Sequence, residues 1–351
     1  MRRKGPRALL ATLLLTGVAL SGCDMSDSAA SRDQILAVGS STVYPFTTAM
    51  AEMFPRKYPD FKAPIVESNG TGAGLKLFCG GIGARFPDIA DASRRIKKSE
   101  FDDCRKNGVG EIVEIQIGID GIAMAESVHG PHFATLSEAD IYKALAADPY
   151  GRPNRARTWR DVNAALPPVP IQVYGPPPSS GTRDAFAELI LTKGCESDPA
   201  MQALKKADAD KQHAICTKIR EDGLFIEAGE NDNLIAQKLA ANPQALGIFG
   251  YSFLEENTAR LRGIPLQGVA PTYQTIASYR YPGARPLFIY VKGAHLNAVP
   301  GLREFVAEYA GSWNPGGYLD RRGLIASPDD VRAKTLAQAR ALVPLDPATV
   351  E

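Results

Sequence analysis

Residues 174–186 read YGPPPSSGTRDAF, and this stretch decides the fold. The run VPIQVYG at 169–175 predicts a strand that ends at the prolines, and RDAFAELIL after it predicts a helix. Two serines, a glycine and a threonine lie between them, and such residues commonly begin a helix. This order of strand, polar loop and helix is typical of a βα unit, which builds a parallel sheet.

The same order occurs twice more in the chain. GSSTVYPF (39–46) follows an apolar run at 35–39, and NGTGAGLKLF (69–78) follows another at 63–68. With PSSGTRDAF (178–186), we call these segments the first, second and third loops. One such loop would be ordinary helix capping. Three at the carboxyl edge of a sheet predict an anion site, because helix N-termini offer unpaired amides and a positive dipole end.

These loops lack the sequence motifs of nucleotide-binding sites and of serine hydrolases. GTGAGLKL lacks the GK[ST] order of a P-loop, and no G-x-G-x-x-G is followed by an acid about 20 residues later. No G-x-S-x-G surrounds Ser180. HGPH (129–132) is interpreted as a surface turn rather than a metal site. The sequence therefore predicts no enzyme, no metal and no cofactor.

The N-terminus has the pattern of an export signal. MRRKGPR is basic, and the apolar stretch ALLATLLLTGVAL after it is too short to span a bilayer. LSGC, which ends at Cys23, resembles the bacterial lipobox, in which the chain is cleaved before the cysteine and the cysteine is lipidated. We expect a signal peptide at 1–22, a lipidated tether at 23–34 and a periplasmic protein anchored through Cys23. The alternative is a plain signal peptide with an incidental cysteine.

Charge and cysteine content agree with export. Removing residues 1–22 removes four of the 40 basic residues and none of the 39 acidic ones. The remaining 36 basic and 39 acidic residues lack the basic excess that nucleic-acid-binding proteins show. The four later cysteines favour disulfides in an oxidising compartment, and no CxxC supports zinc. Of three connectivities we favour Cys79–Cys104 and Cys195–Cys216, because each closes a short loop, worth about 3 kcal/mol.

These features together resemble the periplasmic phosphate-binding proteins of bacterial phosphate ABC transporters. The resemblance covers roughly 35–325, and the segments that carry it, in the family's order, are VGSSTVYPFTTAMAE, NGTGAGLK, DIADASRRIK, SSGTRDAF and NPQALGIFGY. It implies high-affinity binding of inorganic phosphate and its delivery to the membrane permease and ATPase subunits of an ABC transporter. It also implies a monomer that binds no nucleic acid.

The resemblance implies an α/β, two-lobe periplasmic-binding-protein (flytrap) fold. Each lobe would be a largely parallel sheet flanked by helices, with two hinge crossings between the lobes. We expect lobe 1 at 35–117 with 288–346 returning to it, lobe 2 at 118–287 and a tail at 347–351.

The implied phosphate ligands come from the three loops and from the segment after a third predicted strand. They are Ser41, Thr42, Val43, Thr71, Ser93, Arg94, Ser180, Gly181, Thr182 and Arg183. From the second lobe, Glu230 or Asn231 is expected to reach the ligand.

The chain departs from the family twice. Ser93 stands where the family's best-known pattern has an aspartate, and Pro176 where it has an arginine. Arg94 and Arg183 are expected to supply the positive charge instead. The family's aspartate accepts the proton of phosphate and repels sulfate, which has none. The candidates for this acceptor are Asp88, Asp91 and Glu230, or hydroxyls and carbonyls alone.

The sequence leaves other functions open. The chain could be a receptor for another tetrahedral oxyanion such as sulfate, a secreted phosphatase-like hydrolase, or a signalling or adhesive lipoprotein.

Overall fold

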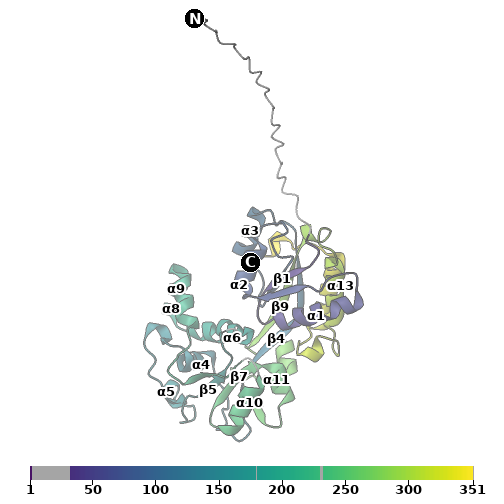
Figure 1. Cartoon of the computed structure of the whole chain (residues 1–351). Coiled ribbons are helices and arrows are strands. Elements are labelled where there is room, and N and C mark those ends of the chain that lie inside the picture. Colours follow the sequence, from purple (N-terminus) through teal and green to yellow (C-terminus); the bar gives the residue numbers. More distant parts are fainter. Residues whose placement is uncertain (2–31, 179, 230–231, 351) are drawn as a thin grey trace. The chain divides into compact units, whose positions relative to one another are not determined.

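The structure is a computed structural model that describes Met1 and residues 32–178, 180–229 and 232–350 (Figure 1). The predicted signal peptide, Cys23, Glu230 and Asn231 lie outside the described residues. Within the described part, no helix has both the length and the apolar character needed to cross a membrane.

The strands form one continuous path through two sheets. The strands are β1 (Leu36–Gly39), β2 (Ile65–Ser68), β3 (Ile89–Ala92), β4 (Ile112–Ser127), β5 (Val173–Gly175), β6 (Phe225–Glu227), β7 (Leu246–Gly250), β8 (Leu261–Gly263) and β9 (Ala284–Lys292). Their order is β2-β1-β3-β9-β4-β7-β5-β6, and β8 pairs with β4. We call the part from β2 to the start of β4 the first lobe's sheet, and the part from the end of β4 to β6 the second lobe's sheet.

Helices connect these strands. The α-helices are α1 (Tyr44–Lys57), α2 (Thr71–Phe78), α3 (Lys98–Lys106), α4 (Glu138–Leu145), α5 (Trp159–Val162), α6 (Gly181–Phe186), α7 (Thr192–Cys195), α8 (Pro199–Ala207), α9 (Ala209–Thr217), α10 (Asp232–Ala241), α11 (Tyr251–Glu256), α12 (Tyr273–Ala277), α13 (Leu302–Ser312) and α14 (Asp329–Ala341). A π-helix, η2 (Ala187–Leu191), joins α6 to α7, and short 3-10 turns lie at Pro149–Gly151, Gly293–His295, Asp320–Arg322 and Pro347–Thr349.

The predicted α/β two-lobe fold is confirmed, but the sheets are less parallel than expected. β1 pairs in parallel with β2 and β3, and β5 does so with β6 and β7. The central strands β4 and β9 are antiparallel to each other and to their other partners. The reason is the connectivity: β4 leaves the first lobe and β9 returns to it, so the two strands run in opposite directions (Figure 1).

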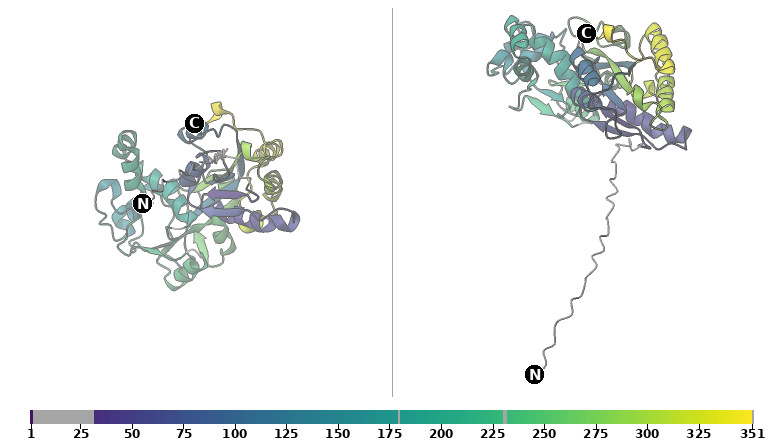
Figure 2. Two further views of the ribbon diagram at one scale, coloured as in Figure 1. Left: turned by 45° about the horizontal axis from the view of Figure 1, so that its top comes forward. Right: turned by 90° about the horizontal axis from the view of Figure 1, so that it is seen from above.

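Helices cover both faces of the first lobe's sheet. On one face α1 and α13 pack around Phe54, Phe305 and Trp313, and on the other α2 and α3 pack around Phe78 and Phe101. Helices α1, α13 and α14 lie side by side in the views of Figure 2. Burial on both faces explains why β1 and β3 are short, almost completely buried runs rather than alternating patterns.

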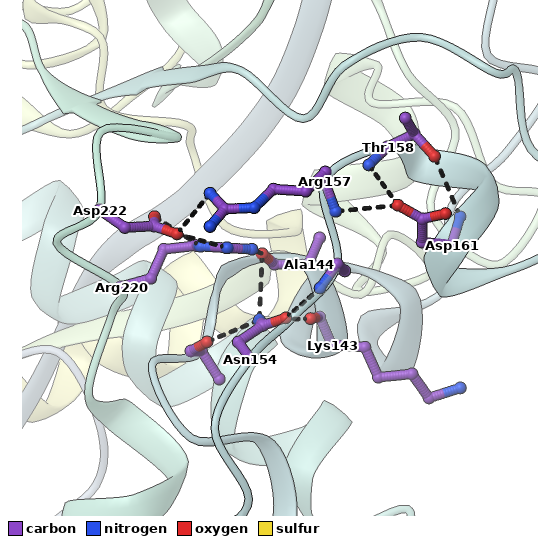
Figure 3. Close-up of polar contacts among 10 residues, drawn as sticks. Lys143, Ala144, Asn154, Arg157, Thr158, Asp161, Arg220 and Asp222 are labelled. Carbon is purple, nitrogen blue, oxygen red and sulfur yellow. Dashed lines mark hydrogen bonds and ion pairs between the residues drawn. The ribbon is translucent and has the colours of Figure 1, made fainter.

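The second lobe closes its core with polar contacts at the end of α4. The side-chain amide of Asn154 donates to the carbonyl of Lys143 at 2.8 Å. The buried Arg220 donates to the carbonyl of Ala144 at 2.8 Å and forms an ion pair with Asp222 (Figure 3). These bonds satisfy carbonyls in the last turn of α4, which the helix itself leaves unpaired. They tie the loop after α4 and the segment after α9 to one helix end.

The structure contains both disulfides in the favoured pairing. Cys79 pairs with Cys104, which links the end of α2 to α3, and Cys195 pairs with Cys216, which links α7 to α9. Each bridge therefore holds a helix of the second or third loop to a neighbouring helix.

A buried carboxyl lies under the first loop. Asp91, at the end of β3, is fully buried and accepts a hydrogen bond from the Thr47 hydroxyl at 3.0 Å. That hydroxyl lies 3.1 Å from the Tyr309 hydroxyl. Burial raises the pKa of Asp91 to about 8, against a smaller opposing effect of the Thr47 hydrogen bond. The folded protein therefore holds Asp91 protonated at neutral pH.

Asp91 should make stability fall as pH rises. The carboxyl has a pKa of 3.8 when unfolded and about 8 when folded, so its contribution is complete below pH 3.8 and is lost as pH rises to about 8. The expected slope is at most about 1.4 kcal/mol per pH unit. Asp91→Asn cannot ionise, so the variant should gain stability relative to the wild type between pH 4 and pH 8.

Urea unfolding at a series of pH values measures this effect. The exposed Asp60 provides the control, because Asp60→Asn is the same substitution outside the buried core. A difference between wild type and Asp91→Asn that does not vary with pH would contradict a protonated Asp91.

Candidate anion-binding site

The first and third loops touch each other. The Thr42 hydroxyl donates to the carbonyl of Gly181 at 2.9 Å, and the Ser41 hydroxyl donates to Asp184 at 3.1 Å. A Cβ on Gly181 would lie 2.1 Å from the amide nitrogen of Thr42, so the two backbones meet where a side chain cannot fit. The structure thus joins two segments 139 residues apart, as the loop pattern predicts.

The second loop joins the end of β3. Thr71 begins α2, and its hydroxyl oxygen lies 2.9 Å from that of Ser93 and accepts the amide of Ser93 at 3.1 Å. Both residues are buried. Gly74, in the next turn of α2, packs on the first loop, since a Cβ there would lie 2.4 Å from the Cα of Gly39. All three loops therefore meet.

Two cavities lie beside the loops. The first has a volume of about 450 Å³ and is lined by Asn69, Gly70, Thr71, Gly72, Ala73, Pro178, Arg183, Asp184, Ala187, Glu188, His213 and Thr217. The second has a volume of about 680 Å³, and its lining includes Ser41, Thr42, Asp120, Ser180, Gly181 and Thr182. Of the predicted hydroxyl ligands, Thr71 lines the first cavity. The second is lined by Ser41, Thr42, Ser180 and Thr182, whereas Ser93 lines neither cavity. Val43 is different, because its side chain is buried in the first lobe's core.

Arg183 lies beside the position where the family carries its arginine. Its Nη1 donates to the carbonyl of Pro176 at 2.9 Å, and its guanidinium lies over the Phe225 ring at 4.5 Å. Partial burial lowers the pKa of Arg183, while Glu227, 3.7 Å away, acts in the opposite direction. The side chain remains a cation, since arginine titrates far above neutral pH.

Arg94 is held by its own lobe. Two of its nitrogens bind Glu100 at 2.8 and 2.9 Å, in the paired geometry typical of arginine and carboxylate. Burial tends to lower the pKa of Arg94, but the bonds to Glu100 outweigh it and the pKa is raised. Its Nη2 would lie 4.0 Å from a Cβ on Gly72, which lines the smaller cavity.

A third arginine joins the site without having been predicted. Arg285 lies on β9 and is 3% exposed. Its Nη2 donates to the Thr42 hydroxyl at 2.5 Å, its Nη1 to Glu188 at 3.2 Å, and its Nε lies 3.6 Å from Asp120 on β4. Burial lowers its pKa, and the nearby carboxylates of Asp120, Glu188 and Asp184 oppose that shift. Arg285 thus links the first loop, a helix of the second lobe and the hinge strand β4.

The Asp120–Arg285 pair retains hydrogen-bonding capacity. Within the described part of the chain, Asp120 Oδ2 and Arg285 Nε are buried atoms without a hydrogen-bond partner. Burial raises the pKa of Asp120, although Arg285 pulls it down. One signal in the sequence could have revealed Arg285: it begins RPLFIYVKG, where a charge precedes an otherwise apolar strand.

The structure contradicts the prediction that Asp88 could accept the proton of the anion. It precedes β3, whereas Ser93 follows that strand, so the two lie at opposite ends. Its carboxylate is already bound by Arg32 at 2.5 Å, by the amide of Leu36 at 2.7 Å and by His295 at 2.6 Å. Asp91 lies under the first loop with Thr47, and Glu230 falls outside the described residues.

The arrangement suits an oxyanion. Hydroxyls, helix N-termini and three guanidinium groups are all hydrogen-bond donors, and guanidinium matches the oxygens of phosphate-like groups. In the described ranges, no group of three or more His, Cys, Asp or Glu side chains could hold a metal ion.

Comparisons with known proteins place the chain in a family. A family model described as the PBP superfamily domain matches residues 25–312. Protein SphX of Synechococcus elongatus is 32% identical over 286 residues, 80% of this chain and 74% of the relative. The phosphate-binding protein PstS of Staphylococcus haemolyticus is 27% identical over 331 residues, 91% of each chain.

A solved structure agrees with these relatives. The crystal structure of a possible phosphate binding protein from Planctomyces limnophilus is 31% identical, with a TM-score of 0.68, over 88% of this chain and 97% of that one. The fold, the meeting of the three loops and these relatives lead to one conclusion: the chain belongs to the PBP superfamily.

Proposed function

We propose that the protein binds inorganic phosphate in the periplasm and delivers it to an ABC-type importer. One observation carries this proposal: the hydroxyl-rich loops of both lobes meet beside Arg94, Arg183 and Arg285. The names of the relatives support it, since they include phosphate-binding proteins and an ABC-type phosphate transport receptor from Vibrio cholerae. The protein would act as a receptor and not as an enzyme.

The donors suffice for tight binding. Micromolar affinity corresponds to about 8 kcal/mol, and each charge-assisted hydrogen bond contributes roughly 1.5–3 kcal/mol. About three to five such bonds meet that requirement, and the loop hydroxyls, the helix N-termini and Arg183 together offer more donors than that. The surplus is available to offset the loss of hydration of a buried anion, which is large.

Closure would occur at β4 and β9. A register shift between Gln116 and Gly118 lies opposite Leu287 and Phe288. Our proposed lobe boundaries, at 117/118 and 287/288, fall at this irregularity. A bulge disturbs the ladder and bends a strand, which suits a hinge.

A sulfate receptor is the second candidate. Ser93 supports it, because a hydroxyl bound to Thr71 replaces the carboxylate that would repel a fully deprotonated anion.

Titration of the anchor-free protein tests the function. We expect phosphate, and arsenate of the same shape and charge, to bind with micromolar or better affinity, and sulfate to bind at least about 100-fold more weakly. Isothermal calorimetry at pH 6 and pH 8 measures all three anions. Equal binding of sulfate would make the second candidate the correct one, and no binding of any of them would refute both.

Arg183 should contribute directly to affinity. Arg183→Met retains the packing against Phe225 but removes the charge. The loss of one charge-assisted interaction should weaken phosphate binding about 10- to 100-fold. Arg157→Met is the matched control, because Arg157 is also a second-lobe arginine paired with a carboxylate, Asp222, and lies in the separate cluster of Figure 3. A similar loss in both variants would mean that overall charge, not the site, sets affinity.

The anchor is part of the same proposal. We propose that residues 1–22 are removed on export and that Cys23 carries the lipid. Cys23→Ala should release the protein into the soluble periplasmic fraction, while the wild type stays with the membranes. Fractionation and the mass of the mature chain decide this, and a wild type without added lipid mass would leave only the plain signal peptide.

A further inference from the structure

Glu188 occupies an unusual turn of helix. It is the second residue of the π-helix η2, which continues directly from α6 and the third loop. π-helical turns are rare and are frequently found at functional sites. Glu188 also lines the smaller cavity together with Thr71 and Arg183. A carboxylate thus faces the space where hydroxyl and guanidinium donors gather.

The charge of Glu188 acts on two of the three arginines. Its Oε2 accepts Nη1 of Arg285 at 3.2 Å. Its negative charge also raises the pKa of Arg94, which belongs to the first lobe. The first-lobe carboxylate of Glu100 has its oxygens bound by Arg94, and Asp184 accepts the Ser41 hydroxyl at the contact between the loops. Glu188 is 40% exposed and is fixed by Arg285 from one side.

We propose that Glu188 accepts the proton of the bound anion and so takes over the role of the aspartate that Ser93 replaces. This inference rests on the proposed function. An ionised carboxylate has acceptors only. A phosphate that keeps a proton can donate it to Glu188 in a short, charge-assisted hydrogen bond. Sulfate has no proton, so its oxygen would face the carboxylate with like charge, which excludes the wrong ligand.

The position of Glu188 explains how the chain can lose the aspartate without losing selectivity. Ser93 and Thr71 share a hydrogen bond at the first-lobe side of the site. Glu188 faces the same cavity as Thr71, but from a helix of the second lobe. The proton acceptor would thereby have moved from one lobe to the other, and it would meet the ligand only when the two lobes are together.

The test compares Glu188→Gln with the wild type and with Glu227→Gln. Gln keeps the shape of Glu188 but can donate to a deprotonated oxygen. Glu227 is the matched control, since it is half-exposed, lies 3.7 Å from Arg183 and does not line the smaller cavity. Calorimetry of the anchor-free proteins with phosphate and with sulfate at pH 7 gives the ratio of the two dissociation constants.

We expect Glu188→Gln to lower the preference for phosphate over sulfate at least tenfold. Glu227→Gln should change both affinities in parallel and leave the ratio as it is. Glu188→Asp, which keeps the carboxylate, should retain rejection of sulfate even if phosphate binds more weakly. This variant also decides the matter if Glu188→Gln does not fold, because loss of sulfate rejection in Glu188→Asp would refute the proposal.

The remaining outcomes are also decisive. An unchanged ratio in Glu188→Gln, or an equal change in Glu227→Gln, would overturn the role of Glu188 while phosphate binding by the wild type still stood. Tighter phosphate binding with sulfate still rejected would show that Glu188 only competes for Arg285. A wild type that binds no phosphate would instead refute the proposed function itself.

Discussion

The contact between the loops and the hinge strands depends on the buried guanidinium of Arg285. A charge taken out of water is costly unless it is paired and hydrogen-bonded, and Arg285 is 3% exposed. It bonds to Thr42 of the first loop and Glu188 of the second lobe, and it pairs with Asp120 of the neighbouring hinge strand. Residues of both lobes and of the other hinge strand, β4, pair with this one cation, so the contact between the loops and the hinge are parts of the same polar network.

The topology explains why this network lies where the loops meet. The parallel strands β1 and β3 direct the first loop and the Ser93 segment to one sheet edge, and β5 directs the third loop to an edge of the other sheet. The long antiparallel pair β4 and β9 belongs to both lobes and carries Asp120 and Arg285 on neighbouring strands. Asp120 also lines the second cavity, so this buried ion pair joins the two strands directly beside that cavity.

Arg183 brings a positive charge to the site from another position in the sequence than in the family's best-known pattern. Arg183 is the third residue of α6, yet its side chain returns to the carbonyl of Pro176, where the family's best-known pattern has an arginine. The proposed role of Glu188 follows the same principle for the negative charge. A binding site constrains where a functional group lies in space, and several backbone positions can place it there.

Much of this molecule is determined by local sequence. Polar loops after short apolar runs and the close cysteine pairs are short-range patterns, and the structure forms each of them. Local sequence did not predict the antiparallel centre of the sheets. It also did not predict that Asp120 and Glu188 pair with Arg285, which only the tertiary structure decided. Arg285 lies 97 residues from Glu188 and 243 from Thr42, and no local pattern connects them. Their association follows from the cost of burying an unpaired charge, a cost that exists only once the chain has folded.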